Sequence, residues 1–193
     1  MLTSINPLGE RARNNRWGFT VGWYLLGTAA SGAAMGVVLG FAGSILPSGS
    51  WALGAVAVVA LVGLVFDLGI GGARLPSIHR QVNEAWLETY RSWVYGLGFG
   101  FQLGTGVITI VTTAAIYVVW AVAFLSGSVL VGGLVGLAFG TIRGSAIFTV
   151  RNVDRPDRLR ALMRRGQRWA VLSGHLSIVA LVFAALSTAA MAI

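Results

Sequence analysis

The chain has 193 residues, of which 56% are hydrophobic and only 10% are charged, and its mean hydropathy is +0.79. Soluble domains carry about 25% charged residues, so this composition excludes an ordinary water-soluble domain and predicts an all-α integral membrane protein with a single polytopic domain over residues 1–193. The net charge of +8 comes from arginines beside apolar runs and indicates no nucleic-acid partner, and the lack of cysteine excludes disulfides, thiolate metal sites and dithiol electron carriers.

Five apolar runs follow a tail at residues 1–16, which we expect to be cytoplasmic. A bilayer core of about 30 Å requires roughly 20 apolar residues in helical form. The runs that meet this length are 17–45, 51–73, 93–126, 128–150 and 169–192, and we predict that each is a transmembrane helix. The third has 34 residues, about 51 Å of helix. It is therefore either tilted or, because glycines crowd its first half, broken, and the sequence leaves both possibilities open.

The arginines predict the orientation of these spans. Three lie in the tail, three in the connection at 74–91 and seven in the connection at 151–168, whereas the connections at 46–50 and 126–128 contain none. Positive charge marks the cytoplasmic side. We therefore expect a cytoplasmic N-terminus, an external C-terminus and a multi-pass location in the inner membrane of a bacterial cell.

The two long arginine-containing connections have apolar residues at helical spacing. We expect a short amphipathic helix over about 77–90 and another over about 155–165, both lying on the inner membrane surface. A solvated loop is the alternative for each.

Three tryptophans stand 76 residues apart, and each follows an arginine by one or two positions. A tryptophan beside an arginine at the start of an apolar run is typical of an anchor at the membrane interface. The interval predicts a repeat of two spans plus an inner helix, with copies related by an axis along the membrane normal. The predicted anchors are Trp17, Trp93 and Trp169.

Glycines recur every fourth residue in three of the spans. Residues at this spacing share one face of a helix, and missing side chains let two helix backbones approach closely in lipid. We expect these faces to pack helices together, and the alternative is a groove that admits a ligand or lipid. The residues are Gly32, Gly36 and Gly40; Gly96, Gly100 and Gly104; and Gly132, Gly136, Gly140 and Gly144.

The few polar side chains inside the spans share one depth. Asp67, Gln102, Arg143 and His175 are each placed roughly 9–14 Å from the predicted cytoplasmic boundary, at ~1.5 Å per residue. A buried charge needs a partner, so we predict that Asp67 and Arg143 form an ion pair or are bridged by water. This layer predicts a ligand or ion pathway, which Thr105 and Thr109 would extend outward; no metal-ligand cluster and no cofactor is indicated.

The layer favours a small permease-like transporter with a pocket near the cytoplasmic side, working as a homo-oligomer in the bilayer. A non-catalytic subunit or assembly factor, docked on a larger membrane complex through its glycine faces, is the alternative. A minor alternative is an intramembrane hydrolase, because Ser145 and His175 resemble the serine–histidine dyad of the rhomboid family. The rhomboid nucleophile lies in Gly-x-Ser-Gly, whereas here Ser145 follows Gly144 and precedes Ala146. We therefore do not expect an enzyme.

Overall fold

In the computed structural model, every described regular element is a helix, so the prediction of an all-α protein is confirmed. The structure describes residues 5–47, 49, 51–72, 75, 85–107, 111 and 113–192, with the backbone alone at 71, 165–173 and 188–192. The elements are α1 (Pro7–Ala12), α2 (Trp17–Gly43), α3 (Trp51–Asp67), η1 (Ile70–Gly72), α4 (Trp86–Thr89), α5 (Ser92–Gly104), α6 (Ala115–Leu125), α7 (Val129–Ser145), η2 (Ala146–Val150) and α8 (Pro156–Ala192).

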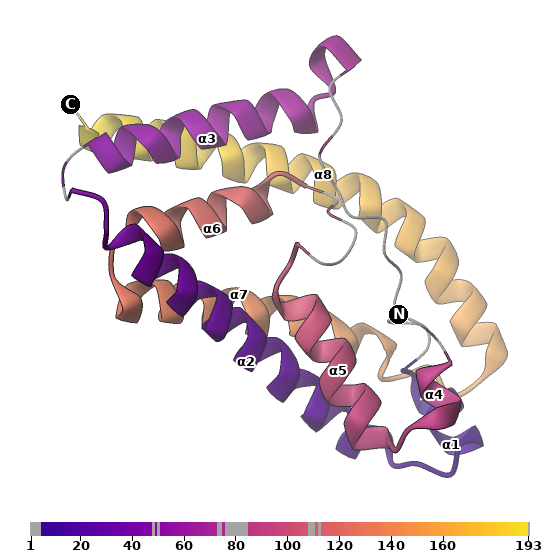
Figure 1. Ribbon diagram of the computed structural model, residues 1–193. Helices are drawn as coiled ribbons and strands as arrows, with labels where there is room; N and C mark the ends of the chain where they lie inside the picture. The colour runs from indigo at the N-terminus through magenta and orange to yellow at the C-terminus, as the bar shows by residue number, and fades with distance from the viewer. Residues whose placement is uncertain are drawn as a thin grey trace.

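Helix α2 lies at the centre of one helical layer and packs antiparallel to α7 through glycines (Figure 1). A β-carbon added at Gly36 would meet the backbone of Gly132, and one at Gly32 would meet the backbone of Gly136. These glycines are buried, and larger side chains at these positions would push the two helices apart.

Helix α5 packs parallel to α2 on another face, and the facing positions are 76 residues apart. A β-carbon at Gly96 would lie 2.8 Å from the carbonyl oxygen of Thr20, and one at Gly100 would meet the backbone of Tyr24. One turn further along, Gly104 faces Thr28 in the same way. The spacing of the tryptophans in the sequence is therefore also the spacing of the residues that meet across this helix pair.

A second layer contains α3, α6 and α8, and α3 runs beside the C-terminal half of α8 (Figure 1). Its core consists of aliphatic side chains that include Val56, Val118 and Leu181. Trp120 of α6 packs edge-on against Phe139 of α7, with ring centroids 5.0 Å apart, and connects the two layers.

The predicted span at 93–126 is broken into α5 and α6. Helix α5 ends at Gly104, and Gly106 follows with a φ of +74°, a left-handed conformation that ends a helix and that glycine adopts without strain. The ring of Phe139 lies against Gly106, so the turn has no room for a side chain.

Other boundaries differ from the predicted ones. The second apolar helix ends at Asp67 and not at residue 73, because Gly69 and Gly72 have positive φ angles. The inner-surface helix predicted at 155–165 and the span predicted at 169–192 form one continuous helix, α8, because no proline follows Pro156 in the chain. Of the helix predicted at 77–90, the structure contains α4, and residues 76–84 lie outside the described part.

Two of the described helices are long and apolar enough to cross a membrane, and they are Trp17–Gly43 and Val129–Val150. Three shorter apolar stretches are the helices Trp51–Asp67 and Ala115–Leu125 and the segment Gly174–Ser187 of α8. This is consistent with membrane association. Two such helices do not by themselves establish the five crossings that the sequence predicts.

Candidate functional site

A fully buried carboxylate lies where the N-terminal segment meets the ends of α2 and α5. Helix α1 begins at an N-cap, where the side chain of Asn6 accepts a hydrogen bond of 2.8 Å from the amide of Gly9, and it buries Glu10 against its neighbours. The hydroxyl of Thr20 donates to Glu10 Oε2 at 2.7 Å, and the hydroxyl of Tyr95 lies 2.7 and 2.9 Å from the two carboxylate oxygens. One side chain therefore holds α1, α2 and α5 together.

The charge of Glu10 is balanced by Arg13, one turn further along. A guanidinium nitrogen of Arg13 lies 2.6 Å from Glu10 Oε1, and the guanidinium lies over the ring of Tyr95 at 5.9 Å. Burial acts to lower the pKa of Arg13, but the hydrogen bond and negative charge of Glu10 outweigh it and raise that pKa above its ordinary value. Asn15 donates to the Tyr95 hydroxyl at 3.1 Å and completes the cluster.

The pattern of residues in the sequence does not place Glu10, Thr20 and Tyr95 together. One signal was present in the sequence, because Glu10 is the only acidic residue before Asp67 and stands in a tail with three arginines. Its partner Tyr95 is 85 residues away, and this pairing depends on the parallel packing of α2 and α5.

Asp67 is bonded to α6 and α8. Its Oδ1 accepts a hydrogen bond of 2.8 Å from the backbone amide of Ala114, and its Oδ2 accepts one of 2.8 Å from the hydroxyl of Ser177. Ala114 is the N-cap residue of α6, where backbone N–H groups have no partner within the helix and where the helix dipole favours a negative charge. Asp67 therefore caps a helix that begins inside the protein.

Asp67 and Arg143 do not form a direct ion pair in the structure. Helix α3 packs against α8 and α6, which give Asp67 its partners, whereas Arg143 lies on α7 with its guanidinium 5.7 Å from the centre of the Phe139 ring. Counting residues from the predicted membrane boundary gave Asp67 and Arg143 the same depth. They lie on helices that pack against different main neighbours, α3 against α8 and α7 against α2.

The other predicted pathway residues are distributed among several helices. Gln102 is partly buried on α5, and its backbone carbonyl accepts a hydrogen bond of 2.9 Å from the hydroxyl of buried Thr105. His175 has an exposed side chain on α8, and Thr109 lies outside the described residues. Ser145, the other member of the proposed dyad, is exposed and donates to the carbonyl of Ile142 in its own helix at 2.6 Å.

Two of the predicted anchor tryptophans, Trp17 and Trp93, lie in the first turns of α2 and α5. The indole of Trp17 donates to the carbonyl of Ile5 at 3.4 Å, and the ring of Trp93 contacts that of Trp23 with centroids 5.9 Å apart. For Trp169 the structure describes the backbone within α8.

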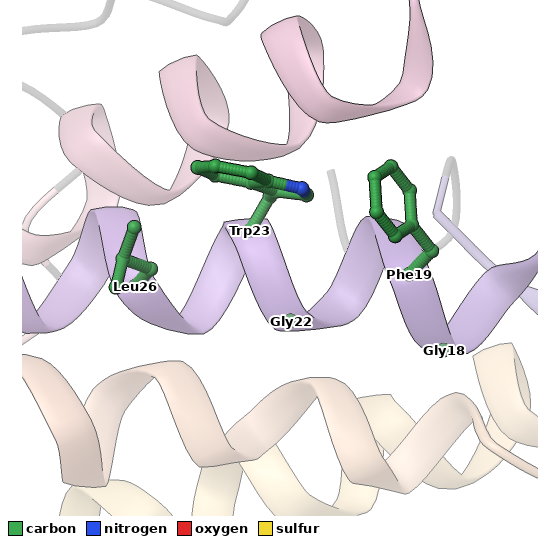
Figure 2. A pocket seen from close by; sticks show the side chains of 5 residues that line it. All are labelled: Gly18, Phe19, Gly22, Trp23 and Leu26. Carbon is green, nitrogen blue, oxygen red and sulfur yellow. The ribbon is translucent and has the colours of Figure 1, made fainter.

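A shallow apolar groove of about 340 Å³ runs along the first half of α2. Figure 2 shows Phe19 and Trp23 projecting from the helix beside the bare backbone at Gly18 and Gly22, with Leu26 further along. A second depression of about 360 Å³ lies at the other end of the molecule, between the α2–α3 and α6–α7 connections, with Trp51 in its lining.

Curated proteins similar to this chain share one description. The methylamine utilization protein MauF of Methylorubrum extorquens is 29% identical over 147 residues, which are 74% of this chain and 52% of the relative. The MauF of Methylobacillus flagellatus is 33% identical over 66% of this chain and 47% of its own length, and that of Methylophilus methylotrophus is 29% identical over 96% of this chain and 67% of its own length. The chain thus spans about half the length of the first two of these relatives.

No family model and no solved structure matches the chain. The relatives are named for methylamine utilization and not for transport, so the prediction of a permease-like transporter is wrong. The error has a physical origin. Polar side chains at one depth were interpreted as a pathway, whereas Asp67 and Thr105 bond to helix backbones.

Proposed function

We propose that this chain takes part in methylamine utilization as a helical protein embedded in the cell membrane. The observation that carries the proposal is its similarity to MauF proteins from four organisms, which in one case extends over 96% of the chain. The structure adds that the carboxylates of Glu10 and Asp67 are engaged in holding helices together. This supports a role that depends on an ordered membrane scaffold.

Growth measures this function directly. The gene for the chain is deleted in its host, and growth is compared with methylamine or ammonium as the sole nitrogen source. We expect the deletion to abolish or strongly slow growth on methylamine alone, and a plasmid copy of the full chain to restore it. Unchanged growth on methylamine would overturn the proposal, and equal loss on both nitrogen sources would indicate a general membrane defect instead.

For the arrangement in the bilayer we propose five crossings with the N-terminus in the cytoplasm. Arginines occur in the N-terminal stretch around α1, between α4 and α5, and in the first turns of α8, and these segments lie toward one end of the molecule (Figure 1). The arginine-free connection between α6 and α7 lies toward the other end, as the positive-inside rule requires.

The helix lengths fit five crossings if α5 and α6 together make one crossing and if only part of α8 crosses. Helices α5 and α6 have 13 and 11 residues, about 20 and 17 Å, so they make one broken crossing between them. Helix α8 has 37 residues, about 56 Å, so its apolar C-terminal part crosses while its arginine-rich first turns remain at the cytoplasmic surface.

We further propose that the 76-residue interval is a structural repeat. The contacts of Gly96 with Thr20, Gly100 with Tyr24 and Gly104 with Thr28 each join positions 76 apart. Equivalent positions of two parallel helices meet in this way when a twofold axis runs between the helices, parallel to them. Such an axis would lie along the membrane normal.

A further inference from the structure

The groove on α2 differs from every other glycine surface of that helix. A β-carbon added at Gly27, Gly32, Gly36, Gly40 or Gly43 would collide with the backbone of another segment, whereas one at Gly18 or Gly22 would have nothing within 4 Å. The space beside each glycine from residue 27 onward is therefore occupied by the backbone of a neighbouring segment. Gly18 and Gly22 leave an open strip of about 12 Å between Gly18 and Leu26, at ~1.5 Å per residue.

Two cationic residues lie at the starts of the two helices that carry Trp23 and its ring partner Trp93. Arg16 is the N-cap residue of α2 and Arg91 is the N-cap residue of α5, and both are exposed. The two helices start at the same end of the protein, and the contact between Trp23 and Trp93 holds their first turns together. Among the described acidic residues near this end, Glu10 is buried and paired with Arg13, Asp154 is paired with Arg158, and Glu88 and Asp157 are exposed.

We propose that the groove holds one acyl chain of an anionic phospholipid, whose phosphate lies against Arg16 and Arg91. This rests on the proposed crossing of the membrane by α2, which places Trp17 at the level of the headgroups and the strip among the acyl chains. The positive charge beside an apolar strip selects an anionic lipid over a neutral one.

The shape of the groove favours a lipid chain over a partner helix. Phe19 is 53% exposed, and together with Trp23 it stands beside the two glycines as a wall of the groove. A second helix can bring its backbone close to a glycine face only where the neighbouring side chains are also small. A flexible acyl chain has no such requirement and can lie alongside the two rings.

Quenching of tryptophan fluorescence by brominated lipids tests the proposal. The full chain is reconstituted in vesicles of phosphatidylcholine with a minor fraction of phosphatidylglycerol, and the bromine is placed either on the phosphatidylglycerol or on a matched amount of phosphatidylcholine. The signal of Trp23 is the difference between the wild-type protein and Trp23→Phe. We expect brominated phosphatidylglycerol to quench Trp23 more strongly, with an enrichment of about fivefold for each arginine that reaches the headgroup.

Matched variants separate the groove from the rest of the surface. Gly22→Leu fills the strip and should abolish the excess quenching, whereas Gly54→Leu on α3 fills an equally open position elsewhere and should retain it. If Gly22→Leu does not fold, Gly18→Leu replaces it. Replacing both arginines, by Arg16→Gln and Arg91→Gln, should equalise the two lipids while quenching persists.

The contrary outcomes are distinct. Equal quenching by both lipids in the wild-type protein, or excess quenching that survives Gly22→Leu, would overturn the lipid site alone. Quenching of other tryptophans but not of Trp23 would mean that protein covers the groove, which also overturns it. If brominated lipid quenches no tryptophan at all, the membrane placement itself fails, whereas a methylamine growth defect would be untouched by any of these results.

Discussion

Two carboxylates, Glu10 and Asp67, each bond to two other segments of the described chain. Glu10 is fully buried and Asp67 is partly buried, so an unpaired charge at either position would be costly. Glu10 is compensated by Arg13 and by the hydroxyls of Thr20 and Tyr95. Asp67 is compensated by a helix N-terminus and by a hydroxyl. At the scale of single residues, each carboxylate therefore links separate helices through hydrogen bonds.

Glu10→Ala should lower the free energy of unfolding by about 3 kcal/mol, because it leaves a partly buried guanidinium without its partner. Glu10→Gln should cost less, since its amide oxygen still accepts from Thr20 or Tyr95. Unfolding in detergent, followed by tryptophan fluorescence, measures both. Glu88→Gln on exposed α4 is the control and should be neutral. A neutral Glu10→Ala would contradict the role of this cluster.

The bond between Asp67 and Ser177 predicts coupling between two residues that are 110 positions apart. Ser177→Ala should cost about 1.5 kcal/mol because it removes one hydrogen bond to a charged group, and Asp67→Ala should cost about 3 kcal/mol because it removes two. Because both changes break the same bond, the double variant should cost less than the sum. The same unfolding assay measures this difference. Strict additivity would mean that the hydroxyl and the carboxylate do not interact in the membrane or in detergent.

At the scale of elements, glycine position decides which helices touch. Gly36 and Gly132 let α2 and α7 pack backbone to backbone, and Gly106 allows the turn that separates α5 from α6. Helix α6 can begin inside the protein because Asp67 caps its first turn. A glycine on an open face, such as Gly54, lacks these contacts and contributes only backbone freedom.

Gly36→Ala and Gly54→Ala should therefore change stability in opposite directions. The new methyl group at Gly36 would meet the backbone of Gly132, so overpacking should cost about 1–3 kcal/mol. At Gly54 the methyl group meets nothing, so alanine should stabilise the helix by about 0.5–1 kcal/mol. Melting temperatures of both variants and the wild-type protein in the same detergent show whether each change raises or lowers stability. A stabilised Gly36→Ala would show that α2 and α7 are further apart than the structure has them.

At the scale of the whole molecule, the described segments divide into an arginine-rich end and an arginine-poor end (Figure 1). At the arginine-rich end, Arg158 pairs with Asp154 at 3.1 Å, but both side chains are exposed, so this pair contributes little to stability. The separation of charge is therefore a signal for orientation in the membrane more than a source of folding energy.

The absence of cysteine makes this orientation testable. Ser126→Cys and Arg155→Cys each place one thiol at an exposed position, in the α6–α7 connection and directly before α8. A membrane-impermeant maleimide added to intact cells should label Ser126→Cys and leave Arg155→Cys unlabelled until the membrane is opened. The opposite pattern would reverse the topology, and labelling of both in intact cells would contradict a crossing by α7.

The sequence by itself was sufficient for the helical class, for the approximate places of the apolar helices and for the segregation of arginine, because each of these depends on local composition and on the need to satisfy backbone groups in an apolar medium. Only the tertiary structure decided that Glu10 is buried beside Tyr95, that Asp67 bonds to Ser177 and Ala114, and that α5 and α6 are separate helices. Those partners are 85, 110 and 47 residues away. Depth along a helix can be counted from the sequence, but the neighbour at that depth is chosen by how the helices pack against one another.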